Sequence, residues 1–156
     1  NSAFMSDRMK GNWLDRLVEL PDHGQVIHLG ESKIIAVPAH FLHSVGNFQF
    51  YDPIAKILFS GDLGTSLVPH EKAAIPVTDF QSHRQYMEGF HKRYIVSRKI
   101  CRYWANMVRQ LDIEQIVPQH GARFVGKKAV ADFISWVEEL ECGVDLMTQE
   151  SYRLPQ

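Results

Sequence analysis

Short apolar runs separated by turn residues dominate the chain from residue 25 to residue 59. The runs cover residues 25–29, 32–37, 48–51 and 56–59. Gly30 and Glu31 separate the first two runs, and residues 52–55 separate the last two, which predicts two β-hairpins. β-branched and aromatic residues fill the runs, as is typical of strands. We therefore expect four strands in this part of the chain.

The hydrophobic pattern becomes helical after Gly64. Residues 79–90, 97–111 and 127–141 each place apolar side chains at helical spacing, which predicts three amphipathic helices. Residues 114–117 form a short apolar run that ends at Pro118, and we expect a fifth strand there. The first twenty residues predict a loop followed by a short helix that ends before Pro21. The tail from Gly143 onwards is polar and without pattern.

Composition places the chain among ordinary globular proteins. It has 156 residues, enough for one domain, of which 45% are hydrophobic and 22% charged. The formal net charge is −1 and no run of Lys and Arg occurs, so we expect no nucleic-acid partner. No stretch approaches 18 apolar residues, so we expect no membrane partner. The two cysteines are far apart in sequence, which favours a reducing, cytoplasmic location.

Three residues with metal-binding side chains follow the ends of predicted apolar strands. They are His43, Asp62 and His120, each with a glycine close by in the sequence. Rigid strands fix the position of the loops that follow them, so active-site residues are often found just after strand ends. A neutral imidazole suits Zn, Fe or Mn, and a carboxylate can bridge two cations. Each position alone is more typical of an ordinary loop, and the three together indicate a metal site.

The remaining histidines and the cysteines are weaker candidates. His40 lies three residues before His43 and competes with it, as a ligand or as a residue that supports one. Three further histidines are interpreted as surface or helix-packing residues; these are His70, His83 and His91. Cys101 and Cys142 are interpreted as small, buried apolar groups.

The three segments together resemble the second half of the metallo-β-lactamase motif set. They read His43-Ser44-Val45-Gly46-Asn47, Phe59-Ser60-Gly61-Asp62 and Pro118-Gln119-His120-Gly121. Asp62 follows His43 by 19 residues and His120 follows Asp62 by 58, which resembles the flavodiiron branch of that superfamily. Residues 38–67 and 90–147 are most similar to the stand-alone oxygen-binding diiron proteins, which lack a flavodoxin domain. The resemblance covers nearly the whole chain.

The resemblance carries implications for fold and ligands. It implies an α/β (α+β) chain that forms half of a four-layer αββα sandwich, with the site at the strand ends. His43 would bind one iron, Asp62 would bridge two irons, and His120 would bind the second. The family's other ligands come from an upstream His-x-Glu-x-Asp-His motif, which does not occur here. We therefore expect residues 1–156 to be the C-terminal part of a single domain, completed by a missing N-terminal half or a homo-oligomer.

Three hypotheses for function follow from the resemblance. The first is a non-haem diiron protein that binds or reduces dioxygen or nitric oxide, as an oxygen sensor or as an oxidoreductase. Without a flavodoxin domain it would need a separate electron donor or signalling protein. The second is a dizinc hydrolase, in which a metal-bound water attacks an ester, thioester or phosphodiester. The third is an inert scaffold half that functions only with its partner.

Overall fold

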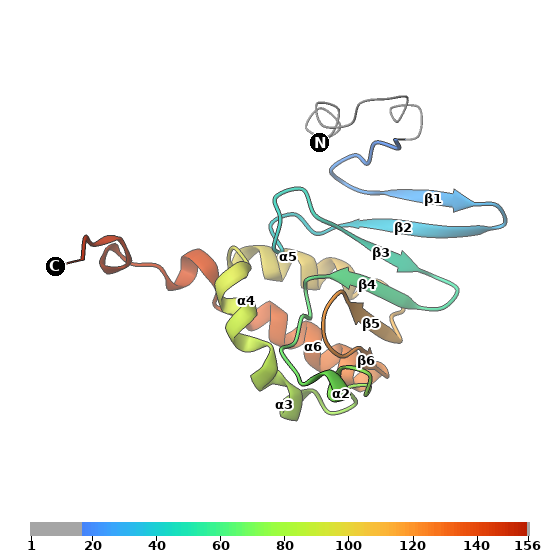
Figure 1. Ribbon diagram of the computed structural model, residues 1–156. Coiled ribbons are helices and arrows are strands. Elements are labelled where there is room, and N and C mark those ends of the chain that lie inside the picture. The colour runs from blue at the N-terminus through green and yellow to red at the C-terminus, as the bar shows by residue number, and fades with distance from the viewer. Residues whose placement is uncertain (1–16, 156) are drawn as a thin grey trace.

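The computed structural model describes residues 17–155 and contains one six-stranded mixed sheet. Its strands lie in sequence order across the sheet (Figure 1). They are β1 (Gln25–Leu29), β2 (Ser32–Pro38), β3 (Phe48–Asp52), β4 (Ile57–Gly61), β5 (Gln115–Pro118) and β6 (Phe124–Val125). Neighbouring strands are antiparallel except for β4 and β5, which run parallel. Both predicted hairpins and the predicted fifth strand are thereby confirmed.

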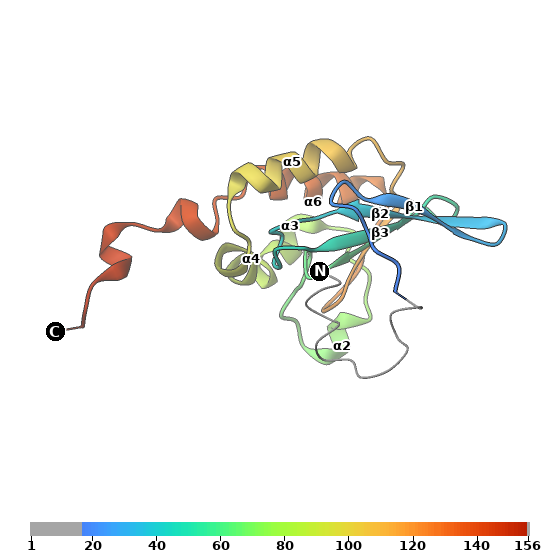
Figure 2. The same cartoon turned by 90° about the horizontal axis from the view of Figure 1, so that it is seen from above.

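Two long helices pack together on one side of the sheet. They are α5 (Arg98–Val108) and α6 (Lys127–Glu139), and both lie above the sheet when the molecule is turned (Figure 2). The parallel pairing of β4 and β5 requires the chain to cross between them, and α5 belongs to this crossover. The predicted helices at 97–111 and 127–141 are confirmed within three residues at each end.

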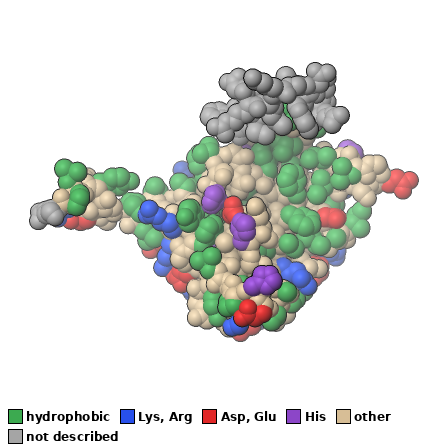
Figure 3. Space-filling model, in the orientation of Figure 1, with side chains coloured by type: hydrophobic (Ala, Val, Ile, Leu, Met, Phe, Trp, Pro, Cys, Tyr) green, Lys and Arg blue, Asp and Glu red, His purple; other side chains and the backbone are tan. Residues whose placement is uncertain are grey.

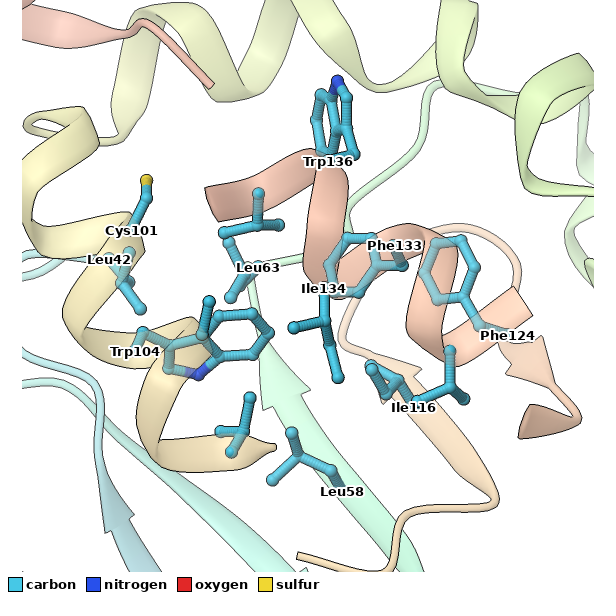
Figure 4. Packing of buried hydrophobic residues seen from close by; sticks show 14 of the residues in the cluster. Leu42, Leu58, Leu63, Cys101, Trp104, Ile116, Phe124, Phe133, Ile134 and Trp136 are labelled. Atoms are coloured by element: carbon cyan, nitrogen blue, oxygen red, sulfur yellow. The ribbon is translucent and has the colours of Figure 1, made fainter. Parts of the chain in front are cut away.

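The core lies between this side of the sheet and the two helices. Leu58 of β4 and Ile116 of β5 point toward Phe133 of α6 and Trp104 of α5 (Figure 4). Buried Gln49 links the two layers, because it accepts a 2.8 Å hydrogen bond from Trp104 Nε1 and donates one of 3.0 Å to the Ser60 carbonyl. Both polar side chains are thus satisfied inside the core, as burial requires.

The continuous helix predicted at 79–90 is wrong. The segment is divided into α3 (Phe80–His83), a 3₁₀ turn (Arg84–Tyr86) and α4 (Glu88–Tyr94). The Tyr86 carbonyl accepts a 2.9 Å hydrogen bond from the Leu67 amide. That carbonyl is turned to a neighbouring loop, and Gly89 adds little helical preference of its own. A tertiary contact therefore breaks the periodic pattern.

Several short elements were not predicted. They are α2 (His70–Ala73), β6, and two 3₁₀ turns in the tail, Gly143–Leu146 and Gln149–Tyr152. β6 has two residues, too few for a period to be visible in sequence. The tail projects away from the body in both ribbon views (Figures 1 and 2). The helix predicted before Pro21 falls mainly outside the described residues, and residues 17–20 are not helical.

The opposite face of the sheet is apolar and partly exposed. Ala36, Phe50, Phe59 and Val117 align across β2 to β5 on that face, and Phe59 is 43% exposed. Figure 3 shows hydrophobic side chains gathered over these strands beside histidine and acidic side chains. The fold is thus α/β, with two long helices on one side of a mixed sheet, as expected for one half of the αββα sandwich. Within residues 17–155, no helix is long and apolar enough to cross a membrane.

Candidate metal centre

His43 lies in a tightly bonded loop between β2 and β3. The Phe41 amide donates to the Ser44 carbonyl at 2.8 Å, and Asn47 Nδ2 donates to the Leu42 carbonyl at 2.9 Å. His43 itself has φ of 90°, a conformation that non-glycine residues adopt only when their surroundings impose it. The loop therefore holds His43 in a defined and locally strained position, as is common at functional sites.

Aromatic rings of α4 pack against the His43 imidazole. The ring of Phe90 lies nearly parallel to it at 5.9 Å between centroids, and the ring of Tyr94 stacks at 5.5 Å. A β-bridge between Leu42 and Ile95 attaches the loop to the end of the same helix. Together these contacts fix the orientation of the imidazole. The helix predicted from sequence ended at Phe90, and nothing in the sequence revealed that His43 packs against Phe90 and Tyr94.

Asp62 lies in a tight turn directly after β4. The Leu63 amide donates to the Ser60 carbonyl at 3.2 Å, and the Thr65 amide donates to the Asp62 carbonyl at 3.1 Å. Gly61 and Gly64 have φ of 59° and 106°, so the glycines on either side of Asp62 supply the left-handed backbone that this turn requires. The turn thereby presents the carboxylate at the end of a buried strand.

The buried side chain of His91 holds the Asp62 turn in place through a hydrogen bond to Gly64. It is fully buried in α4, where its Nδ1 donates to the Met87 carbonyl at 2.8 Å and its Nε2 accepts from the Gly64 amide at 2.9 Å. Both nitrogens have partners only when the imidazole is neutral with the proton on Nδ1. The interpretation of His91 as a packing residue is confirmed, and its role as an anchor for the turn was not evident from sequence.

Acidification is expected to destabilise the fold through His91. Burial lowers its pKa from 6.5 to about 4, so the folded state binds this proton less readily than the unfolded chain does. Stability therefore falls as the pH drops through 6.5 and the loss is complete below about 4, amounting to roughly 3 kcal/mol. Urea unfolding between pH 7 and pH 4 measures the loss.

The matched control for this prediction is His91→Gln. Glutamine can donate to Met87 and accept from Gly64, but it does not titrate. The variant should lose most of the pH dependence, and the remaining slope should include His83, whose pKa is also lowered by burial. An unchanged slope in His91→Gln would contradict the assignment.

His120 follows β5, and its loop is joined to the Asp62 turn. The Gln119 amide donates to the Gly61 carbonyl at 2.7 Å, and the Ser66 amide donates to the His120 carbonyl at 3.3 Å. The two hydrogen bonds therefore hold the loops that carry Asp62 and His120 against each other. The parallel pairing of β4 with β5 brings both strand ends to the same edge of the sheet, which explains how residues 58 positions apart become neighbours.

Gly121→Ala is expected to disrupt this junction. A Cβ at Gly121 would lie 2.1 Å from Ser66 Oγ and 2.6 Å from the Ser66 carbonyl oxygen, and the residue has φ of 89°. Backbone must move to relieve the clash, so we expect a loss of about 2–4 kcal/mol in unfolding free energy. Gly30→Ala is the control, because its φ is also positive but nothing lies within 4 Å of an added Cβ. If both variants lose the same unfolding free energy, the clash with Ser66 is not the cause of the loss in Gly121→Ala.

The three candidate ligands meet at one point of the surface. Asp62 Oδ2 lies 3.7 Å from His43 Nδ1, and Asp62 Oδ1 lies 3.7 Å from His120 Nε2. The carboxylate thus stands between the two imidazoles with one oxygen toward each. Sequence reasoning predicted that these residues converge, and the distances confirm it.

The donor set fits a pair of metal ions that share Asp62. Two donors bound to one ion at about 2.1 Å lie roughly 3–4 Å apart, so each 3.7 Å separation can accommodate one ion. Each ion would then have two donors from this chain, fewer than the three that catalytic sites usually have. In agreement, no group of three or more His, Cys, Asp or Glu side chains within residues 17–155 could by itself hold a metal ion.

The other candidates have different surroundings. His40 Nε2 is 2.7 Å from the Asp22 carbonyl oxygen and its ring packs edge-on against Phe48, so its described contacts do not involve the three residues above. His83 is buried among aromatic rings and His70 is exposed in α2, which confirms their interpretation as packing and surface residues.

Comparisons with known proteins connect this geometry to a family. The model of the family described as "ODP family beta lactamase" matches residues 5–121, a stretch that includes His43, Asp62 and His120. No curated protein sequence matches the chain significantly.

Two solved structures share 39% sequence identity with it. "Peroxy diiron species of chemotaxis sensor ODP" has a TM-score of 0.80, and "Apo state of chemotaxis sensor ODP from T. denticola" has one of 0.81. In both cases the match covers 90% of this chain and 57% of the other chain. This chain therefore spans little more than half the length of these relatives.

More distant structures share the fold. The rubredoxin oxygen:oxidoreductase of Desulfovibrio gigas has 16% identity and a TM-score of 0.74, with 88% of this chain and 34% of the other chain covered. The flavodiiron protein from Giardia intestinalis has 18% identity and a TM-score of 0.67, with 78% of this chain and 29% of the other chain covered, which confirms the resemblance to flavodiiron proteins at the level of fold.

Proposed function

We propose that this chain, which belongs to the ODP family of beta lactamases, supplies three ligands of a diiron centre that binds dioxygen. One observation carries the proposal: the Asp62 carboxylate directs one oxygen toward each of two histidines at equal distance. A shared carboxylate offsets the charge of two neighbouring cations, and imidazole with carboxylate suits iron. The description of one relative as a peroxy diiron species supports iron and dioxygen over the dizinc alternative.

The chain's own residues have defined tasks in this proposal. His43 would hold one iron and His120 the other, while Asp62 would contact both. Phe90 and Tyr94 would keep the His43 ring in place and shield one side of it from water. When bound, two ferrous ions supply the electrons that binding of a diatomic ligand requires.

We propose further that residues 1–156 are the C-terminal part of one sandwich domain. The apolar face over β2 to β5 lies beside the candidate ligands and needs a cover, since contiguous exposed apolar surface is unusual in isolated proteins. A second sheet on this face would bring the remaining donors to the metal ions. This arrangement accounts for both the open face and the incomplete donor set.

An oxygen sensor is the favoured form of the activity. Both relatives at 39% identity are described as chemotaxis sensors. A sensor of this kind would pass its state to a signalling protein, whereas a reductase would require a separate electron donor. The two free cysteines fit the proposed cytoplasmic location.

Dioxygen uptake tests this proposal. The intact protein is loaded with ferrous iron without oxygen, and measured amounts of dioxygen are then added in the presence and absence of a reductant. We expect uptake of one dioxygen for each pair of irons, and little further consumption with reductant. Sustained consumption would indicate a reductase, and the absence of uptake by the iron-loaded protein would contradict the proposal.

A further inference from the structure

Two cysteines that are far apart in the sequence meet at the root of the C-terminal tail. Cys101 lies in α5, and Cys142 immediately precedes the 3₁₀ turn Gly143–Leu146. Their sulfurs are 3.9 Å apart, both residues are fully buried, and both are free thiols. We propose that this pair is an oxidisable site, at which a peroxide converts the two thiols into a disulfide that attaches the tail to α5.

The two thiols differ in pKa because their surroundings differ. The hydrogen bond between the two sulfurs lowers the pKa of Cys142, and the same bond together with burial raises the pKa of Cys101. Either sulfur can donate the hydrogen bond that joins them. We assign Cys142 as the attacking sulfur because it borders the exposed tail, and the lowered pKa of its thiol agrees with this. Because the thiolate is the nucleophile in thiol oxidation, Cys142 reacts first and Cys101 resolves the product.

The reaction balances with one molecule of peroxide. The Cys142 thiolate attacks one oxygen of hydrogen peroxide, the O–O bond breaks, and the sulfur becomes a sulfenic acid as hydroxide leaves and takes up a proton. The Cys101 sulfur then attacks the sulfenic sulfur, loses its proton, and displaces the second water. In total, two thiols and hydrogen peroxide give one disulfide and two waters. The sulfurs must approach by roughly 2 Å to reach the bonded distance.

The tail root can open to admit the oxidant. It is held by a 2.9 Å hydrogen bond from the Val144 amide to the Val96 carbonyl, and by Asp145 Oδ2, which accepts from the amides of Arg98 and Cys142. Beyond these contacts the tail extends away from the body, and Leu154 is 90% exposed (Figure 2). Segments with few buried contacts open at low free-energy cost. Oxidation should therefore be slow and governed by opening of the tail root.

The disulfide would also restrict the motion of Val96, which is hydrogen-bonded to Phe41 in the loop that carries His43. Val96, which accepts the Val144 amide, donates its own amide to the Phe41 carbonyl at 3.4 Å. Locking residue 142 onto α5 holds Val144 against Val96. The expected local result is that exchange of the Val144 amide hydrogen slows by at least about tenfold in the oxidised protein, because the opening that exposes it is suppressed.

Peroxide treatment of the metal-free intact protein tests the proposal. Removal of iron prevents reactions of peroxide at the metal centre. We expect peptides of the denatured protein to show that Cys101 and Cys142 lose their alkylatable thiols together, as one linked peptide pair lighter by two hydrogen atoms, with no covalent dimer. A dithiol reductant should restore both thiols. The oxidised protein should melt roughly 5–10 °C higher, since the bond closes a long loop.

Single variants separate pairing from independent oxidation. In Cys101→Ala and Cys142→Ala the remaining thiol has lost its 3.9 Å neighbour, so neither variant should gain thermal stability on treatment. The thiol count and mass of the unsubstituted protein show whether Cys101 and Cys142 pair, even where a variant folds poorly. Persistence of both thiols after prolonged treatment, addition of oxygen atoms without loss of hydrogen, or covalent dimers would each overturn the proposal.

Discussion

Replacement of Asp62 by alanine is expected to abolish binding of both metal ions in the intact protein. Asp62 is the only one of the three candidate ligands that faces both others, at 3.7 Å on each side. Its loss removes one donor from each ion and leaves two cations facing each other without the shared negative charge. Changes in residues that merely support ligands already cost about 10- to 100-fold in metal affinity, so we expect a loss of more than about 100-fold for both ions.

Matched variants sharpen this test. His40→Ala should retain both metals, because His40 contacts Asp22 and Phe48 rather than the three candidate ligands. His43→Ala should weaken one ion more than the other, since His43 faces a single oxygen of Asp62. Metal content after dialysis measures each case. Loss of metal in His40→Ala together with retention in His43→Ala would show that the ligand assignment is wrong.

Phe133→Ala is expected to cause the largest loss of stability in the core. Phe133 is fully buried, stacks on Phe124 at 4.6 Å, and contacts the rings of Phe80, Trp104 and Trp136. Truncation leaves a cavity that rigid aromatic neighbours cannot fill, so we expect unfolding free energy to fall by about 3–5 kcal/mol. That is a large part of the stability of a typical domain.

Phe133→Leu is the control, because it keeps most of the volume and should cost roughly 1–2 kcal/mol. Urea unfolding of the metal-free protein measures both variants without a contribution from metal binding. A loss below about 1 kcal/mol in the alanine variant would mean that the core collapses around the site more easily than its packing indicates.

The sequence predicted the elements whose hydrophobic period extends over several residues. Alternation and turn residues located the hairpins around Gly30 and residues 52–55, and helical spacing located α5 and α6. It failed at residues 79–90, where the Leu67 amide bonds to the Tyr86 carbonyl and interrupts the helix. Such a contact depends on the completed fold, and no local pattern contains it.

The candidate ligands were predicted from motifs, and their supports were not. The positions after apolar strands identified His43, Asp62 and His120. The anchoring of Gly64 by His91 and the stacking of α4 rings on His43 join residues whose separation in sequence carries no signal. The meeting of Cys101 with Cys142 is another example, since their wide spacing suggested two unrelated packing residues.

The metal content of the intact, natively produced protein tests the central claim most directly. Elemental analysis after gel filtration gives both the identity of the metal and its ratio to protein. A diiron centre that shares Asp62 predicts two irons per chain, both lost in Asp62→Ala. Zinc in place of iron, or two irons retained by Asp62→Ala, would contradict it.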